Sequence, residues 1–132
     1  MSLIDPYDPA FRLDRDEMDE THREFLVLLN SLAEARGHDF EKLFLSLCEH
    51  TEQHFAQEKE WMQESGFPAI GEHVDDHQRI LGELNKLRLK VRKGAIGFAK
   101  AYVSDRLPEW FRLHLATMDS ALAAHLKQCE AA

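Results

Sequence analysis

HFAQEKEWM, residues 54–62, carries the pattern that decides the fold. His54 and Glu58 are four residues apart, so on a helix they differ by only about 40° around the axis and reach one point. Apolar residues at helical spacing extend this segment over about residues 39–65, and Gly66 ends it. Its predicted inner face consists of Phe40, Leu43, Leu47, Thr51, His54, Glu58 and Met62. The pattern therefore predicts an amphipathic helix with ionisable groups on its buried side.

Three further segments show the same helical periodicity. They cover about residues 14–36, 71–93 and 98–128, and glycines mark the turns between them. No stretch alternates between apolar and polar residues as a strand does. Four amphipathic helices with short loops predict an all-α fold, an antiparallel up-down-up-down four-helix bundle. Pro108 is expected to kink the last helix, because it has no N–H to donate to the carbonyl of Ser104.

Length and charge limit the classes of protein to which the chain can belong. Its 132 residues predict one domain, residues 14–132, after an irregular lead-in over residues 1–13. The net charge of −8 argues against binding to nucleic acid or to an anionic membrane surface. No apolar run approaches the roughly 20 residues that span a bilayer. Cys48 and Cys129 suggest no disulfide framework, so we expect a cytoplasmic protein.

Each predicted helix has at least one histidine on its inner face, and two carboxylates join them: His22, His54, His73, His77, His114, Glu58 and Asp119. A buried ionised carboxylate is unfavourable unless it is paired or binds a metal, so the group predicts a cation site. His114 and Asp119 are five residues apart, about 140° around a regular helix. Both side chains reach one site only if they lie on either side of the direction that points into the bundle, or if the helix is locally unwound. The alternative is five separate core histidines, each satisfied by a backbone group or by water.

Four motifs, one in each predicted helix, resemble those of the hemerythrin family. They are MDETH (18–22), HFAQEKEWM (54–62), HVDDH (73–77) and WFRLHLATMD (110–119). These stretches match the family patterns D-x-x-H, H-F-x-x-E, H-x-x-x-H and W-x-x-x-H-x-x-x-x-D. The resemblance covers roughly residues 11–128. It implies a four-helix protein that binds O2 reversibly at a non-haem di-iron centre.

The resemblance also implies a role for each of these seven side chains. His73, His77 and His114 would ligate one iron, His22 and His54 the other, and Glu58 and Asp119 would bridge both. Two six-coordinate irons offer about twelve positions, of which these ligands and a bridging oxo or hydroxo group fill about eleven. We expect O2, or an azide-like anion in the oxidised form, to bind at the position that remains on the iron with two histidines.

This histidine-rich ligand set favours oxygen binding over catalysis. Ferritin-like di-iron oxidases use four carboxylates and two histidines, which is a more anionic set. We therefore expect a protein for oxygen storage, delivery (transport) or sensing, and not an enzyme. We also expect it to be a monomer or small homo-oligomer. The alternatives are a di-iron enzyme or stress protein that handles O2, peroxide or nitric oxide, an iron-donating repair protein, and a metal-free interaction bundle.

Two positions beside the expected oxygen pocket depart from the family pattern. The family usually has leucine where this chain has Phe25 and Phe111. Both rings are expected to line the pocket and make it smaller. The alternative is that they only repack the core.

Three other positions carry expectations about exposure and packing. His50 lies one turn before a predicted ligand and Lys59 directly after another, and both are expected to face solvent. The family has a tryptophan in its lead-in that this chain lacks. Tyr7 or Phe11 is expected to take its place.

Overall fold

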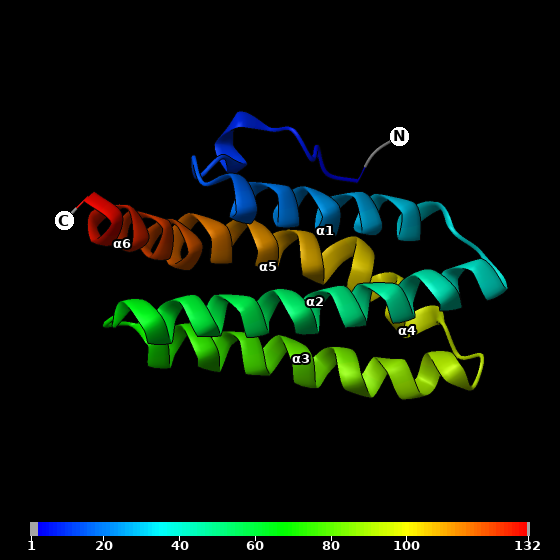
Figure 1. The fold of residues 1–132 in the computed structure, drawn as a ribbon. Coiled ribbons are helices and arrows are strands. Elements are labelled where there is room, and N and C mark those ends of the chain that lie inside the picture. The colour runs from blue at the N-terminus through cyan, green and yellow to red at the C-terminus, as the bar shows by residue number, and fades with distance from the viewer. Residues whose placement is uncertain (1–2, 132) are drawn as a thin grey trace.

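The computed structural model describes residues 3–131, and every regular element in this range is a helix (Figure 1). The elements are η1 (Pro9–Phe11), α1 (Asp16–Glu34), α2 (Gly37–Ser65), α3 (Ile70–Arg92), α4 (Gly97–Ala101), η2 (Tyr102–Arg106), α5 (Leu107–His114), η3 (Leu115–Asp119) and α6 (Ser120–Ala131). The elements from α4 to α6 follow one another directly as one rod. The predicted four-helix bundle is therefore confirmed. Residues 1–2 and 132, which the predicted lead-in and domain include, lie outside the described range.

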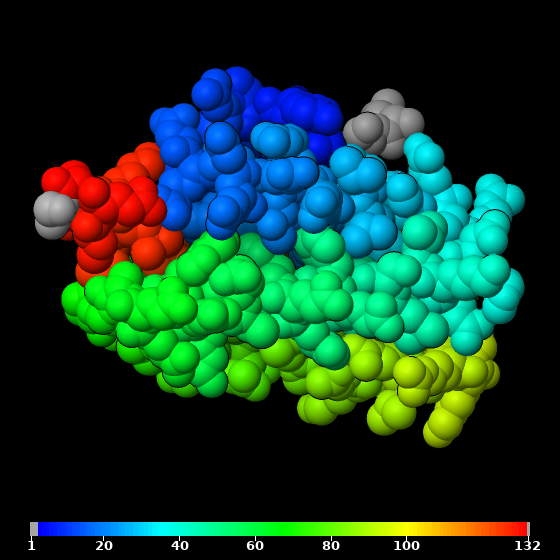
Figure 2. Space-filling view, viewed as in Figure 1, coloured from blue at the N-terminus to red at the C-terminus, as the bar shows by residue number. Residues whose placement is uncertain are grey.

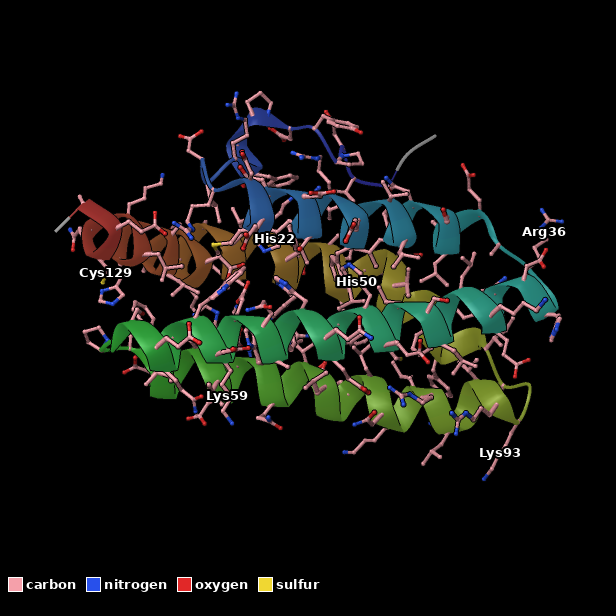
Figure 3. The ribbon with its side chains drawn as sticks, viewed as in Figure 1. His22, Arg36, His50, Lys59, Lys93 and Cys129 are labelled. Atoms are coloured by element: carbon pink, nitrogen blue, oxygen red, sulfur yellow. The ribbon has the colours of Figure 1, made fainter. Side chains whose placement is uncertain are left out.

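The four rods pack along one another (Figure 1). α2 contacts both α1 and α3, and the rod from α4 to α6 contacts α1, α2 and α3. The α1–α2 turn and the α3–α4 turn lie at the same end of the bundle, where Figure 3 shows Arg36 and Lys93. At the opposite end Gly66 closes α2 with a φ of +66°, which favours glycine. There the N–H of Phe67 donates to the carbonyl of Met62 at 2.9 Å, so the predicted stop at Gly66 is confirmed.

Two π-helical turns widen the fourth rod. In η2 the N–H of Leu107, the residue directly before Pro108, donates to the carbonyl of Tyr102 five residues earlier. The predicted irregularity at Pro108 is therefore a wide turn, and the chain stays helical on both sides of it. In η3 the N–H of Ser120 donates to the carbonyl of Leu115. Single π turns inside α-helices are frequent at functional sites.

The core consists of the inner faces of all four rods. On α1, every residue that the periodicity places inward is buried: Met18, His22, Phe25, Leu26, Leu29 and Leu32. The prediction for α2 was too narrow, because Phe44 and Phe55 are buried as well, whereas the predicted Leu43 is only half-buried. On α3, Ile80 is fully buried. Each rod packs against more than one neighbour, so its buried face is wider than a single stripe.

The chain before α1 lies along the outer side of that helix (Figures 1 and 2). Two hydrogen bonds join Ile4 to Asn30. The N–H of Ile4 donates to Asn30 Oδ1 at 3.0 Å, and Asn30 Nδ2 donates to the carbonyl of Ile4 at 2.8 Å. Farther along, the N–H of Leu13 donates to Asp19 Oδ1 at 2.9 Å. The lead-in is thus fixed to α1 near both of its ends.

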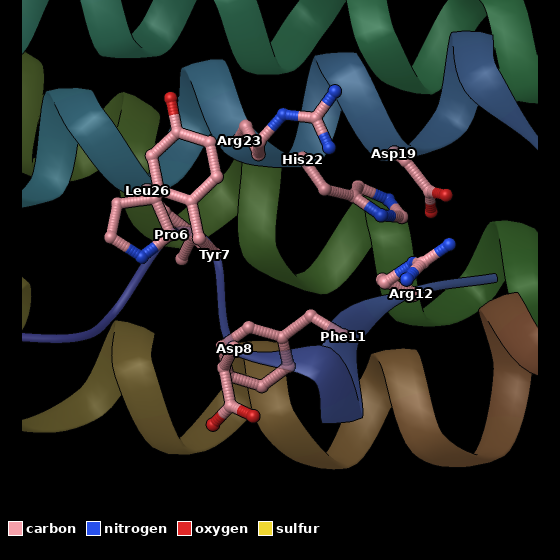
Figure 4. A pocket seen from close by; sticks show the side chains of 9 residues that line it. All are labelled: Pro6, Tyr7, Asp8, Phe11, Arg12, Asp19, His22, Arg23 and Leu26. Carbon is pink, nitrogen blue, oxygen red and sulfur yellow. The ribbon is translucent and has the colours of Figure 1, made fainter. Parts of the chain in front are cut away.

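Of the two candidates for the missing tryptophan, Phe11 is the one that packs against the bundle. Its ring lies edge-on to Phe111 with the ring centroids 5.3 Å apart, whereas Tyr7 is 74% exposed. A cavity of about 80 Å³ lies between the lead-in and α1, and Arg12 and His22 are among the residues that line it (Figure 4). None of the helices in residues 3–131 has the length and apolar content needed to cross a membrane.

Candidate metal centre

The bundle brings all seven predicted site residues together in its interior. His22 lies on α1, His54 and Glu58 on α2, His73 and His77 on α3, His114 at the end of α5 and Asp119 at the end of η3. Figure 3 shows His22 inside the bundle. Six of the seven residues are buried, and the side chain of His54 is 10% exposed. Every rod therefore contributes to one polar cluster in a largely apolar core.

Glu58 stands between two groups of histidines. Its Oε1 atom is 3.1 Å from His73 Nε2 and 3.5 Å from His77 Nε2. Its Oε2 atom is 2.9 Å from His54 Nε2 and 3.7 Å from His22 Nε2. Each oxygen thus faces a different pair of imidazoles, which is the arrangement of a carboxylate that can bridge two cations.

Asp119 divides its oxygens in the same way. Its Oδ1 atom is 3.2 Å from His73 Nε2 and 3.1 Å from His114 Nε2, whereas Oδ2 is 3.3 Å from His22 Nε2. The potential ligand atoms fall into two groups, in each of which all atoms lie within 4.8 Å of one another. One group is Glu58, His73, His77, His114 and Asp119, and the other is His22, His54 and Glu58.

Asp119 reaches this centre because the fourth rod is wide at η3. On a regular α-helix, residues five apart point about 140° away from each other. The π turn between Leu115 and Ser120 adds a residue to the turn, so that His114 and Asp119 share one face. The sequence left two geometries open for this pair, and local unwinding is the one that the structure contains.

Burial and mutual contact shift the pKa values of the clustered groups. Burial opposes the charge of both carboxylates, yet the surrounding histidines hold the pKa values of Glu58 and Asp119 well below the usual range. Burial also opposes protonation of the imidazoles, yet contacts with Asp119 and Glu58 raise the pKa of His22 to about 10 and that of His73 to about 9. For His77, burial lowers the pKa to about 3. Without a metal, two carboxylate charges are therefore balanced by protons on histidines.

The donor set fits a pair of divalent metal ions. His22 Nε2, Glu58 Oε2 and Asp119 Oδ1 are buried, and although ring nitrogens or carboxylate oxygens lie close to them, none of the three makes a well-directed hydrogen bond among residues 3–131. Two imidazole nitrogens, His77 Nε2 and His114 Nε2, face each other at 3.1 Å. Imidazole and carboxylate together are suitable ligands for iron and other first-row metals. One cation in each group would give all of these atoms a partner.

Asp76 is a functional candidate that the sequence analysis missed. It lies inside HVDDH but turns toward α5, where its Oδ2 atom accepts hydrogen bonds from His114 Nδ1 at 2.7 Å and from Trp110 Nε1 at 2.9 Å. Metal-binding histidines commonly donate their second ring nitrogen to a carboxylate. That rule made the two aspartates between His73 and His77 candidates, but the sequence alone could not say which helix they face.

A small cavity of about 10 Å³ adjoins the centre on the side of His22 and His54. Its other walls are Asp119, His114 and four aromatic side chains, Phe25, Phe55, Trp110 and Phe111. Phe25 and Phe111 stack with their ring centroids 5.6 Å apart, and Phe111 lies edge-on to His22 at 5.5 Å. The two phenylalanines that depart from the family pattern thus meet each other beside the two-histidine group.

His50 does not belong to the centre. Its Nε2 atom lies 3.1 Å from Glu24 Oε1 and its side chain is 20% exposed. His50 therefore faces solvent only in part, and its partner is a surface carboxylate and not the cluster. Lys59 is exposed, as predicted.

The comparison with protein families shows to which group this arrangement belongs. The sequence model described as "Hemerythrin HHE cation binding domain" matches residues 13–126, which is most of the chain. The chain belongs to the hemerythrin family. The matched range includes all seven clustered residues and the whole of the π turn at η3.

Individual hemerythrins are similar to the chain over most of its length. It is 33% identical over 119 residues to a bacteriohemerythrin of Ralstonia nicotianae, and the matched region covers 90% of this chain and 86% of that protein. It is 26% identical over 101 residues to a myohemerythrin of Riftia pachyptila, with 76% and 82% covered. A crystal structure of a hemerythrin mutant has the same fold, with a TM-score of 0.84 at 21% identity over 96% of this chain and 98% of that one.

Proposed function

We propose that this hemerythrin binds O2 reversibly at a di-iron centre and serves in oxygen storage, delivery or sensing. The observation that carries the proposal is the position of Glu58, whose two oxygens face two separate groups of histidines at 2.9 to 3.7 Å. Asp119 repeats this division from the opposite rod. Two carboxylates that each face both groups of histidines are suited to bridge two cations that lie side by side.

In this proposal the two groups hold one iron each. His73, His77 and His114 would hold the first iron, His22 and His54 would hold the second, and Glu58 and Asp119 would bind to both. The iron pair would supply the electrons that O2 accepts when it binds. The second iron has fewer histidine ligands, and the aromatic cavity adjoins this same side of the centre.

The chain's own contribution at this cavity is to limit access. A volume of about 10 Å³ has room for the centre of roughly one water-sized molecule. Phe25 and Phe111 stack across it, so larger molecules must displace a ring. An apolar wall also keeps water and anions away, which protects reduced iron from oxidation.

The lining of the cavity favours binding over catalysis. Apart from proposed iron ligands, the residues that line it within the described chain are Phe25, Phe55, Trp110 and Phe111. The indole N–H of Trp110 already donates to Asp76. No side chain among these four is therefore free to transfer a proton, as the activation of bound O2 or peroxide requires. We further propose that the protein acts in the cytoplasm, because Cys48 and Cys129 are both free thiols.

Iron content and oxygen uptake test this function together. Protein loaded anaerobically with ferrous iron should hold two irons per chain by elemental analysis. On addition of O2 an oxygen electrode should record uptake of one O2 per two irons and then no more. Continued consumption with added reductant would instead support the di-iron enzyme, and absence of iron would support a metal-free bundle.

A further inference from the structure

Asp76 occupies an unusual place among the acidic residues of α3. It lies between His73 and His77 in sequence, but its side chain is only 10% exposed and contacts α5. One oxygen, Oδ2, accepts from both His114 Nδ1 and Trp110 Nε1, at 2.7 and 2.9 Å. The other oxygen pairs with Arg79 on the surface side. Both oxygens of this carboxylate thus have partners, and two of the three donors come from the helix that carries His114.

The bond to Asp76 decides which nitrogen of His114 is available as a ligand. A neutral imidazole has one N–H and one lone pair, and a carboxylate acceptor holds the proton on the nitrogen that faces it. With the proton on Nδ1, Nε2 keeps its lone pair for a cation, which it would share with Asp119 Oδ1, 3.1 Å away. His22 and His73 differ, since their buried Nδ1 atoms have no hydrogen-bond partner among residues 3–131.

Trp110 covers one face of the His114 ring. Its indole ring stacks on the ring of His114 with the centroids 4.7 Å apart and the planes 22° apart, and Trp110 is only 6% exposed. Because Trp110 donates to the same oxygen of Asp76 that His114 uses, the three side chains fix one another. Hydrogen bonds to a charged group are stronger where water is excluded.

We propose that Asp76 is a positioning residue that fixes the tautomer and the ring orientation of His114, and thereby strengthens metal binding at the centre. This inference rests on the proposed function. Asp76 itself contacts no proposed bridging group and acts only through His114 and Trp110. Loss of such an outer partner typically weakens metal affinity by about 10- to 100-fold.

Asp75 provides a matched control, because it is adjacent, has the same charge and is exposed. Zn²⁺ affinity measured by competition with a chelator should fall about 10- to 100-fold in Asp76→Asn and stay unchanged in Asp75→Asn. A general effect of charge would weaken both variants equally and would overturn the proposal. Circular dichroism establishes that both variants are folded.

A second measurement needs no metal. In the metal-free protein, ¹⁵N NMR should detect slowly exchanging ring N–H protons of His114 and Trp110 in the wild type and in Asp75→Asn. Asp76→Asn should shift both signals and speed their exchange. Unchanged signals in Asp76→Asn would refute the positioning role. If the wild type binds no Zn²⁺ at the centre, the proposed function fails, but these N–H signals still decide the role of Asp76.

Discussion

Asp119 Oδ1 lies 3.1 Å from His114 Nε2 although the two residues are five apart in the sequence. A regular α-helix would direct them about 140° apart. The π turn over Leu115–Asp119 brings both side chains to the centre. Two ligands five residues apart therefore need the widened turn to reach the same site.

Moving the carboxylate by one residue should not rescue the site. The variant Asp119→Ala/Met118→Asp has the i,i+4 spacing that suits an ordinary helix. Because η3 is wide, position 118 points in another direction, and Met118 is only half-buried there. The iron content of the double variant should be as low as that of Asp119→Ala alone, by elemental analysis after gel filtration. Iron content restored to the wild-type level would show that the π turn is not required.

Replacing a histidine inside the cluster should differ sharply from replacing its neighbour outside. His77→Ala removes a nitrogen that faces Glu58 and His114, so most of the iron should be lost. His50→Ala removes only a contact with Glu24, so iron retention should match the wild type. Both variants are compared under the same dialysis against a chelator. Equal iron loss in the two would mean that α2 and α3 contribute other ligands than those assigned.

Phe25 and Phe111 should control access to the cavity. Phe25→Leu and Phe111→Leu remove ring volume without adding polarity, at a cost of about 1 kcal/mol in the free energy of unfolding. Stopped-flow measurements should show faster azide binding to the oxidised protein, and autoxidation should be faster too.

Phe44→Leu is the control for the phenylalanine variants. Phe44 is fully buried on α2 and is not part of the cavity. Its replacement should lower stability by a similar amount and leave both rates unchanged. Wild-type rates in Phe25→Leu and Phe111→Leu would make the two rings ordinary core packing.

The stability of the metal-free protein should be highest near pH 6.5. His22 and His73 have folded pKa values of about 10 and about 9 against 6.5 when unfolded. Their contribution is fully present below pH 6.5 and is lost as the pH rises toward 10. His77 acts in the opposite sense: its pKa of about 3 makes the folded state resist protonation, so stability also falls below pH 6.5.

Thermal unfolding of the metal-free chain across this pH range measures the effect. The midpoint of the wild type should fall between pH 6.5 and about 9.5. It should fall less in His22→Gln/His73→Gln, where the raised pKa of His114 and general charge repulsion are what remains. A midpoint that rises over this range would show that these histidines are not protonated in the folded state.

Much of the fold follows from local patterns. The spacing of Leu26, Leu29 and Leu32 is enough to predict an amphipathic α1, and Gly66 to predict the end of α2. Each of these patterns involves only residues that lie within a few helical turns of one another in the sequence. The wider buried face of α2, with Phe44 and Phe55, was missed because it depends on which rods pack side by side.

The candidate site also contains residues that local patterns predict and residues whose contacts depend on packing between helices. The seven clustered residues were predicted from motifs within single helices and from a family resemblance. Asp76 was not, because its bond to His114 depends on how α3 packs against α5. The contact of His50 with Glu24 also joins two helices, and the sequence contains no signal for it.

Reversibility of oxygen binding tests the central claim most directly. The ferrous protein is exposed to O2, flushed with argon and exposed again while its visible absorption spectrum is recorded. The account predicts an absorption band that appears with O2, disappears under argon and returns at full amplitude over repeated cycles. A band that persists under argon, or an amplitude that decays to that of the ferric protein in the first cycle, would contradict reversible oxygen binding.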